Sequence, residues 1–398
     1  MSAGEKPAGA AGRRLLALLL LHSAITQVVT FVLRPTSAYR ALELDVPTAW
    51  LGALTASFAV VPLVLAVPSG QATDRFGERR VMLVGAVLLA LSGAIFWTER
   101  GGAAGLVLGS VVLGTGHLLS VVGQQAAVAN TAGPGRFDTA FGYYTFAASL
   151  GQAAGPALIT VLGGDGALPD TTPIFAAATG LGVVLFACTA FLRMPARERT
   201  SGDAAAGGMG TLLRLPGLVR ALVISCVVLS AVDITLVYLP ALGADRGLAA
   251  GVVGLLLTLR AVASMTSRFF LGRLVALTGR RRLMIASVAL SAVSMAVVAV
   301  PMPTAVMAVL VVLLGLGLGV GQPLTMSWLA EVAPPGLRGR AMSLRLTGNR
   351  LGQVLIPSAV GLVAVGVGAA GVLATTAAAL AAVGIAARKL AVHGGAGA

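Results

Sequence analysis

Charged residues are scarce in this chain of 398 residues. Asp, Glu, Lys and Arg make up 11% of it, while hydrophobic residues make up 57%. Soluble domains carry about 25% charged residues, so water cannot be the main solvent of this protein. The charges present are mostly cationic, with 28 Lys and Arg against 14 Asp and Glu. Because these arginines lie between apolar runs and not on an aromatic-interleaved surface, we expect no nucleic-acid partner.

Cysteine and the common catalytic motifs are also nearly absent. The two cysteines, Cys188 and Cys226, each lie inside an apolar run and are expected to be small buried hydrophobes. There is no Walker sequence, no Gly-x-Ser-x-Gly nucleophile and no His cluster with metal-ligand spacing. The stretch GLGLGVGQ from Gly315 lies in an apolar run, which indicates helix packing and not a dinucleotide loop. The sequence therefore predicts neither an enzyme, nor a metal site, nor a cofactor.

Long apolar runs dominate what remains. A membrane-crossing helix needs about 20 mostly apolar residues, and the sequence predicts an all-α membrane protein with twelve transmembrane helices. The spans are expected at 14–37, 48–69, 81–98, 104–127, 140–163, 173–193, 216–240, 250–271, 283–300, 304–329, 341–366 and 369–388. The segment Arg13–Ala24 resembles a signal peptide but continues into the first run, so we expect an uncleaved first helix.

The two halves of the chain repeat each other. The stretch GQATDRFGERRVM from Gly70 aligns with GRLVALTGRRRLM from Gly272, 202 residues later. The stretch from Pro134 to Pro156 aligns without gaps with that from Pro335 to Pro357. We therefore expect two pseudo-symmetric six-helix bundles, with a site near the midplane where they meet. The predicted domains are residues 1–193 and 216–398, joined by a polar linker, 194–215.

The basic residues predict the orientation of the chain. Nearly all Lys and Arg fall in one set of loops, and the opposite set holds only Arg40, Arg100 and Arg246. By the positive-inside rule both termini and the linker are expected in the cytoplasm. The cytoplasmic membrane is the expected location. The high content of arginine and alanine is typical of proteins encoded by bacterial genomes rich in G and C.

The loop after the second span carries a family resemblance. The chain resembles the major facilitator superfamily over its whole length, and the match to the loop signature of that family lies at Gly70, Asp74, Arg75, Gly77, Arg79 and Arg80. The resemblance implies that Asp74 contacts the cytoplasmic ends of neighbouring helices, including the span 341–366, and latches the outward-facing state. The second copy has Ala276 at the position of the Asp, so an Asp-dependent latch is expected in the first half only.

A second resemblance lies in the span 140–163. Gly151, Gly155 and Pro156 match a signature of drug:proton antiporters, while Ile159 and Thr160 replace its last two glycines. The resemblance is thus to the bacterial drug or metabolite:proton antiporter branch, although the first span lacks a carboxylate.

Ionisable residues deep in a span are costly and normally face a cavity or a partner. Asp233 is the one carboxylate clearly in the middle of a predicted span, where it either carries a proton, pairs with the substrate or forms a structural ion pair. Arg260, in the following span, is its candidate partner, with substrate contact and a structural role both open. Arg34, Arg260, Arg268, Arg345 and Arg350 outnumber this acid, which favours an anionic or zwitterionic substrate.

Further polar side chains recur at helical spacing on interior faces. Packing and cavity lining are both open for each of them. The predicted proton and substrate pathway comprises Asp233, Arg260, His117, Gln124, Gln27, Gln152, Gln322, Asn349, Arg350 and Gln353. Arg345 is assigned either to the same polar face or to a cytoplasmic gate.

The resulting prediction is a monomeric secondary active transporter in the lipid bilayer. It exports a small organic molecule, either a drug-like compound or a secreted metabolite, with protons as the coupling ion. One alternative is uptake of an anionic or zwitterionic metabolite by symport or uniport. A further alternative is a receptor or assembly partner that keeps the fold without transport, which the many interior polar residues disfavour.

Overall fold

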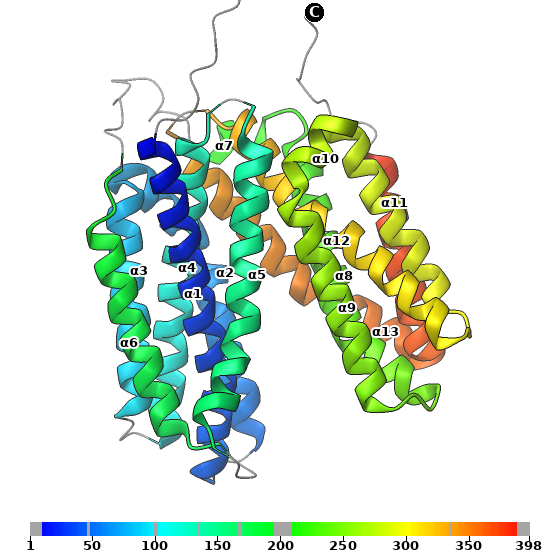
Figure 1. Cartoon of the computed structure of the whole chain (residues 1–398), viewed down its shortest axis with the longest axis horizontal. Coiled ribbons are helices and arrows are strands. Elements are labelled where there is room, and N and C mark those ends of the chain that lie inside the picture. Colours follow the sequence, from blue (N-terminus) through cyan, green and yellow to red (C-terminus); the bar gives the residue numbers. More distant parts are fainter. Residues whose placement is uncertain are drawn as a thin grey trace, which may run out of the picture. The chain divides into compact units, whose positions relative to one another are not determined.

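A computed structural model describes residues 10–45, 48–98, 102–133, 135–164, 169–194, 209–334 and 336–387. Every regular element in this part of the chain is helical (Figure 1). The helices are α1 (Ala10–Glu43), α2 (Thr48–Phe76), α3 (Glu78–Trp97), α4 (Gly102–Thr131), α5 (Phe137–Leu162), α6 (Thr171–Ala190), α7 (Met209–Leu213), α8 (Leu218–Asp245), α9 (Ala250–Phe269), α10 (Leu271–Thr278), α11 (Arg280–Val298), α12 (Thr304–Val332) and α13 (Arg338–Ala387).

Twelve of these helical segments are long, and this confirms the predicted fold class. Two elements, α7 and α10, are short, and α13 is two helices because the backbone leaves the helical region at Gly368, where φ is +63°. Ten helices within the described residues are long and apolar enough to cross a membrane. Most of the predicted linker 194–215 lies outside the described residues, and α7 occupies part of the remainder.

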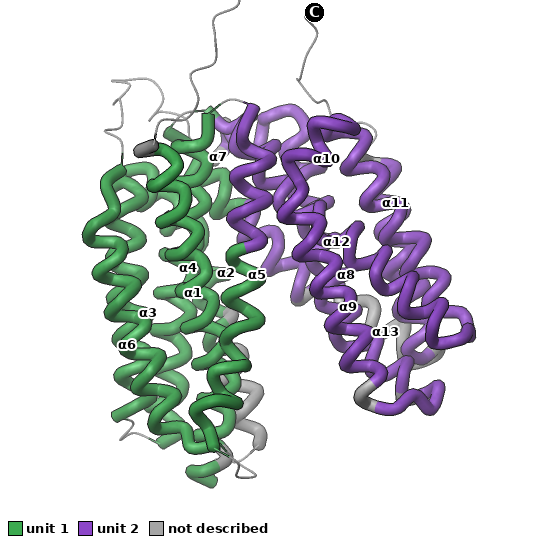
Figure 2. Tube along the Cα trace, in the orientation of Figure 1, with its two compact units in different colours: residues 1–133, 147–206, 334–344 green, residues 134–146, 207–333, 345–398 purple. Residues whose placement is uncertain are grey.

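The chain forms two compact units, which Figure 2 shows in different colours. Unit 1 contains residues 1–133, 147–206 and 334–344, and unit 2 contains residues 134–146, 207–333 and 345–398. The units therefore follow the two halves of the sequence except for two short segments. These are the beginning of α5, which belongs to unit 2, and the beginning of α13, which belongs to unit 1.

Each unit has its own apolar core. In unit 1 the core side chains come from α1, α2, α3, α4 and α6, and include the stacked rings of Phe96 and Phe175. In unit 2 they come mainly from α8, α11, α12 and the end of α13. Many apolar side chains nevertheless stay exposed on the outer faces, as expected for helices whose solvent is lipid.

Glycines let α12 pack closely against its neighbours in unit 2. A β-carbon at Gly315 or Gly319 would collide with the α9 backbone, and one at Gly317 would collide with Ser291 of α11. Small residues of this kind allow helix backbones to approach each other in a membrane protein. The GLGLGVGQ stretch is thus part of a packing surface.

Candidate functional site

A buried polar cluster in unit 1 centres on His22 of α1. The amide nitrogen of Gln124 (α4) donates to His22 Nδ1 at 2.7 Å and to Thr26 Oγ1 at 2.9 Å. Nε2 of His22 lies 2.8 Å from Thr189 Oγ1, whose own proton goes to the carbonyl of Leu185 in α6. Since Nδ1 accepts and Nε2 must donate, the ring is the neutral Nε2–H tautomer. His22 therefore ties α1, α4 and α6 together.

His117 of α4 lies beside this cluster. Thr30 of α1 donates its hydroxyl proton to the carbonyl of Thr26 at 2.8 Å, so His117 Nδ1, 3.0 Å from the hydroxyl oxygen, is the donor of that second bond. The His117 ring lies 5.8 Å from the ring of Phe58, and the Arg34 guanidinium lies 4.5 Å from the same ring. The arrangement combines a hydrogen-bonded histidine with a cation–π contact on α1 and α2.

Gln27 and Gln152 form a weaker contact between α1 and α5. The amide of Gln152 donates to Gln27 Oε1 at 3.4 Å, the long end of the hydrogen-bond range. Close packing of the two helices comes from Gly151 and Gly155, where a β-carbon would collide with the α1 backbone. The antiporter-like glycines thus belong to a helix crossing, and Pro156 follows Gly155 in the same helix.

A second buried cluster lies in unit 2, between α8, α12 and α13. Arg345 Nη1 donates to Gln322 Oε1 at 2.7 Å, and Asn349 donates to the same oxygen at 3.2 Å. Ser225 donates to Asn349 Oδ1 at 2.8 Å, and Gln322 donates to the carbonyl of Ser225 at 2.7 Å. The predicted residues Gln322 and Asn349 are therefore bonded directly to each other, and Arg345, one of the largest fully buried side chains in the described part of the chain, donates to Gln322.

Asp233 is linked to α13 by hydrogen bonds. Gln353 Nε2 donates to Asp233 Oδ2 at 2.7 Å, and Arg350 Nη1 donates to Gln353 Oε1 at 2.9 Å. Arg260 of α9 is 6% exposed and lies within electrostatic reach of Asp233. Gln353 of α13 is thus a hydrogen-bond partner of Asp233, and Arg260, the candidate partner expected from the sequence, is electrostatically coupled to the same carboxylate.

Arg268 has a structural role on α12. Pro323 has no N–H, so the carbonyl of Gly319 lacks its usual donor within the helix. Nε of Arg268 donates to that carbonyl at 3.3 Å. The guanidinium thus satisfies a backbone group that the proline leaves open, one residue from Gln322.

The loop signature lies where α2 meets the beginning of α13 in unit 1. Asp74 accepts hydrogen bonds from the backbone N–H groups of Gly339 at 2.8 Å and Arg340 at 3.0 Å. These are first-turn donors, which have no acceptor within their own helix. The side chain of Asp74 is 5% exposed, and Arg340 Nε lies 3.7 Å from it. A β-carbon at Gly70 would overlap Ser343, so that glycine permits the close crossing.

The other residues of the signature have separate roles. Gly77 adopts φ +89°, a conformation that favours glycine, in the turn between α2 and α3. Arg79 donates to the carbonyl of Ala190, which joins the beginning of α3 to the end of α6. Arg75 and Arg80 are exposed. Only part of the signature therefore contacts α13.

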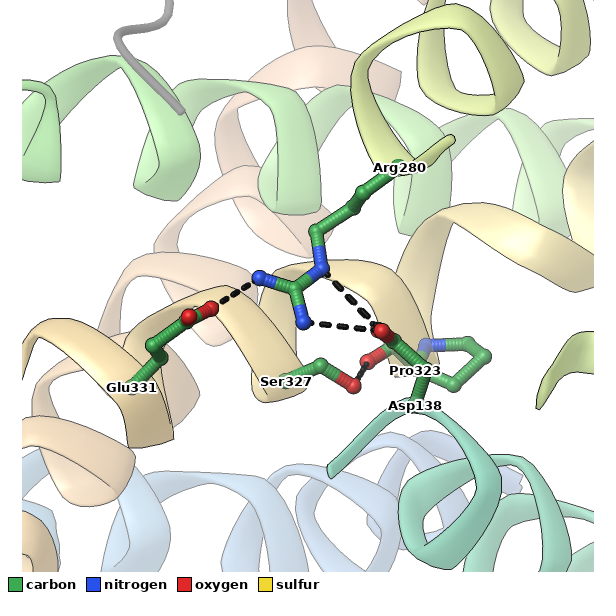
Figure 3. A network of polar contacts seen from close by, with 5 residues as sticks. All are labelled: Asp138, Arg280, Pro323, Ser327 and Glu331. Carbon is green, nitrogen blue, oxygen red and sulfur yellow. Dashed lines mark hydrogen bonds and ion pairs between the residues drawn. The ribbon is translucent and has the colours of Figure 1, made fainter. Parts of the chain in front are cut away.

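Unit 2 has an acidic contact of its own, between α5 and α11. Arg280, the first residue of α11, donates to both carboxylate oxygens of Asp138 on α5, with Nη2–Oδ2 at 2.8 Å and Nε–Oδ1 at 3.1 Å (Figure 3). Arg280 also pairs with Glu331 near the end of α12. Ala276 removes the acid of the second loop copy, and the acid of this contact lies instead on α5, at the position that corresponds to Gly339 in the repeat.

The predicted site residues thus fall into small groups within each unit. Unit 1 brings together His117 with Thr30, Gln124 with His22, and Gln27 with Gln152. Unit 2 brings together Gln322 with Asn349, and Asp233 with Gln353 and Arg350. Sequence reasoning left out Ser225, a small residue with no distinguishing pattern around it. Transport of substrate or protons by these residues stays a prediction.

The long apolar helices define a multi-pass helical membrane protein with polar clusters buried among its helices. The family model of the Major Facilitator Superfamily matches residues 16–249 and 221–394, so the chain belongs to that family. Its members are transporters and not enzymes. No curated protein sequence matches the chain.

Several solved structures share the fold. The fucose:proton symporter FucP of E. coli is 15% identical, with a TM-score of 0.83 over 96% of this chain and 100% of that chain. The human organic anion transporter MFSD10 (TETRAN) is 18% identical, with a TM-score of 0.80 over 94% and 99%. A bacterial homologue of the iron transporter ferroportin is 16% identical, with a TM-score of 0.76 over 95% and 99%. At these identities the likeness establishes the fold.

Proposed function

We propose that the protein is a proton-coupled secondary transporter of a small organic molecule. It works as a monomer in the cytoplasmic membrane, with both termini in the cytoplasm. Its two halves, residues 1–193 and 216–398, rock about a midplane site and expose it to each side in turn. Family membership supports alternating access, and the positive-inside distribution of arginine supports the orientation.

The observation that carries the proposal is the environment of Asp233. A carboxylate inside a span is costly unless it has a function or a partner. Asp233 is held by Gln353 at 2.7 Å and lies within reach of Arg260, so it can be ionised or protonated without losing every contact. Protonation would remove the attraction between Asp233 and Arg260 and leave the guanidinium available to a substrate anion. Proton binding and substrate binding would then be linked at neighbouring side chains.

Export is the direction that we propose first, for a drug-like compound or a secreted metabolite. It is supported by the partial antiporter signature at Gly151, Gly155 and Pro156. The glycines of this signature also serve the crossing of α1 and α5, so their support for a direction of transport is limited to the resemblance.

Uptake of an anionic or zwitterionic metabolite is the second candidate. Arg260 and Arg345 are buried and Arg350 is partly buried in unit 2, beside the single intramembrane carboxylate that we identify, Asp233. A cationic excess of this kind favours a carboxylate or phosphate group on the substrate. The fold is shared with an organic anion transporter and with a sugar:proton symporter, so both chemistries are compatible with the architecture.

Transport in proteoliposomes with an imposed pH gradient tests the proposal. Fluorescein, an organic anion, and ethidium, a lipophilic cation, serve as probes, and entrapped pyranine reports proton flux. In Asp233→Asn we expect loss of gradient-driven accumulation with retention of substrate exchange. Asp245→Asn, an exposed acid at the end of the same helix, should behave as the wild type. Unchanged proton-coupled flux in Asp233→Asn would show that Asp233 is not the carrier, and movement of ethidium alone would exclude an anionic substrate.

A further inference from the structure

The beginnings of α5 and α13 occupy equivalent positions in the repeat. Each crosses another helix at a glycine: a β-carbon at Gly70 of α2 would overlap Ser343 of α13, and one at Gly272 of α10 would overlap Thr139 of α5. Gly70 and Gly272 are repeat partners, 202 residues apart. Each unit therefore has a close crossing at the corresponding glycine, with the incoming helix met about one turn apart in the two cases.

The charges at the two crossings are reversed. In unit 1 the acid is Asp74 on α2, and the beginning of α13 offers backbone N–H groups. In unit 2 the acid is Asp138 in the first turn of α5, and Arg280 of α11 offers a guanidinium. The incoming helix is thus the electropositive partner in unit 1 and the electronegative partner in unit 2.

The supporting residues are reversed as well. Arg280 and Glu331 pair in unit 2, and Glu78 and Asn130, at the repeat-equivalent positions, are hydrogen-bonded to each other in unit 1. A basic residue at the beginning of α11 therefore replaces an acidic one at the beginning of α3. Glu331, an acid at the end of α12, replaces the amide Asn130 at the end of α4.

We propose that Asp138, Arg280 and Glu331 form a second latch whose polarity is opposite to that of the latch at Asp74. An acid in the first turn of α5 suits the dipole of its own helix, and it makes this helix end negative. By repeat equivalence an acid at position 276 would face Asp138, and two carboxylates would repel each other. Ala276 is therefore a requirement of the reversed latch and not the loss of one.

The latch has a function only if the halves of the sequence move apart, so the inference rests on the proposed alternating access. Asp138 belongs to the first half, while Arg280 and Glu331 belong to the second. When the cytoplasmic side opens, the bidentate contact must break. The side chains of Asp138 and Arg280 are only 7% and 13% exposed, so solvent screens this contact far less than a surface ion pair.

Exchanging the polarity tests the inference. Hydrogen–deuterium exchange of residues 137–146 in purified protein reports opening of the latch without any knowledge of the substrate. We expect Asp138→Asn to increase exchange by at least about fivefold, the lower end of typical coupling between conformational states. Ala276→Asp should also increase exchange, because it places two acids together.

The double variant Asp138→Asn with Ala276→Asp decides the question. With the acid moved to the loop, α5 offers only its N-terminus, as α13 does to Asp74, and exchange should return towards the wild-type rate. This rescue also excludes simple misfolding of the single variants. If Ala276→Asp has the same effect in both backgrounds, or if Asp138→Asn leaves exchange unchanged, the reversed latch is refuted. Faster exchange in the single variants with rescue in the double variant, together with no gradient-driven transport by the wild-type protein, would instead count against the proposed function alone.

Discussion

Replacing Asp74 by Ala should release the beginning of α13 from α2. The carboxylate accepts two backbone hydrogen bonds, from Gly339 at 2.8 Å and Arg340 at 3.0 Å, and it is 5% exposed. Those N–H groups lie in the first turn of α13, so no carbonyl of the same helix can replace the lost acceptor. Alanine removes both acceptors and also the nearby charge that pairs with Arg340.

The expected cost follows from these contacts. Hydrogen bonds to a charged group contribute about 1.5–3 kcal/mol each, so two of them contribute about 3–6 kcal/mol. Water that reaches the freed N–H groups compensates part of the lost hydrogen-bond energy. We therefore take the lower limit of the range, about 3 kcal/mol, as the expected cost. An energy of about 3 kcal/mol corresponds to roughly a 150-fold shift in a two-state equilibrium. Asp74→Asn, which keeps one acceptor and loses the charge, should give an intermediate shift.

Hydrogen–deuterium exchange of the amides of Gly339 and Arg340 measures this shift directly. In Asp74→Ala both amides should exchange faster by up to about two orders of magnitude. The population should move towards the inward-open state, which thiol probes on the cytoplasmic side would detect. Arg75→Ala is the matched control, because this neighbouring side chain is exposed and lies against Phe76. Wild-type exchange at both amides in Asp74→Ala would refute the assigned role of the carboxylate.

Two further predictions concern packing and the polar core. Gly319→Ala should destabilise the protein by about 1–3 kcal/mol through overpacking against Ser267, seen as a lower thermal midpoint in detergent. Gly254→Ala in α9 meets no atom within 4 Å and should keep or raise the midpoint, because alanine favours the helix. Equal midpoints for the two variants would exclude the packing argument. His22→Ala should cost about 1–3 kcal/mol because Gln124 loses a buried acceptor. Retention of the wild-type midpoint in that variant would show that the histidine does not join the helices.

The long helices could be predicted from the sequence because lipid demands a long apolar run for each span. The predicted spans 341–366 and 369–388 flank Gly368, the residue at which α13 breaks. The prediction of 48–69 ends too early, since α2 continues to Phe76 through the polar part of the loop signature. Hydropathy measures burial in lipid, and a helix that continues into the aqueous boundary carries no such signal.

The polar contacts were less predictable than the helices. Helical periodicity fixes the direction of a side chain relative to its own axis, but not which neighbouring helix it meets. Arg260 was thus named as a candidate partner of Asp233, whereas the hydrogen bond that Asp233 accepts from Gln353, 120 residues away, was not predicted. Asp138 was missed for a related reason. An acid in the first turn is usual for a helix, so nothing in the sequence pointed to Arg280.

The glycines of α12 have a consequence for motion as well as for packing. Where side chains interdigitate across a helix interface, one helix can slide past another only if rotamers change. At Gly315, Gly317 and Gly319, α12 has no side chain to interdigitate with α9 and α11. At these positions α12 meets only backbone and the small side chains of Ala263, Ser267 and Ser291. A small sliding step of α12 would therefore require fewer rotamer changes here than at an interface of interlocked large side chains.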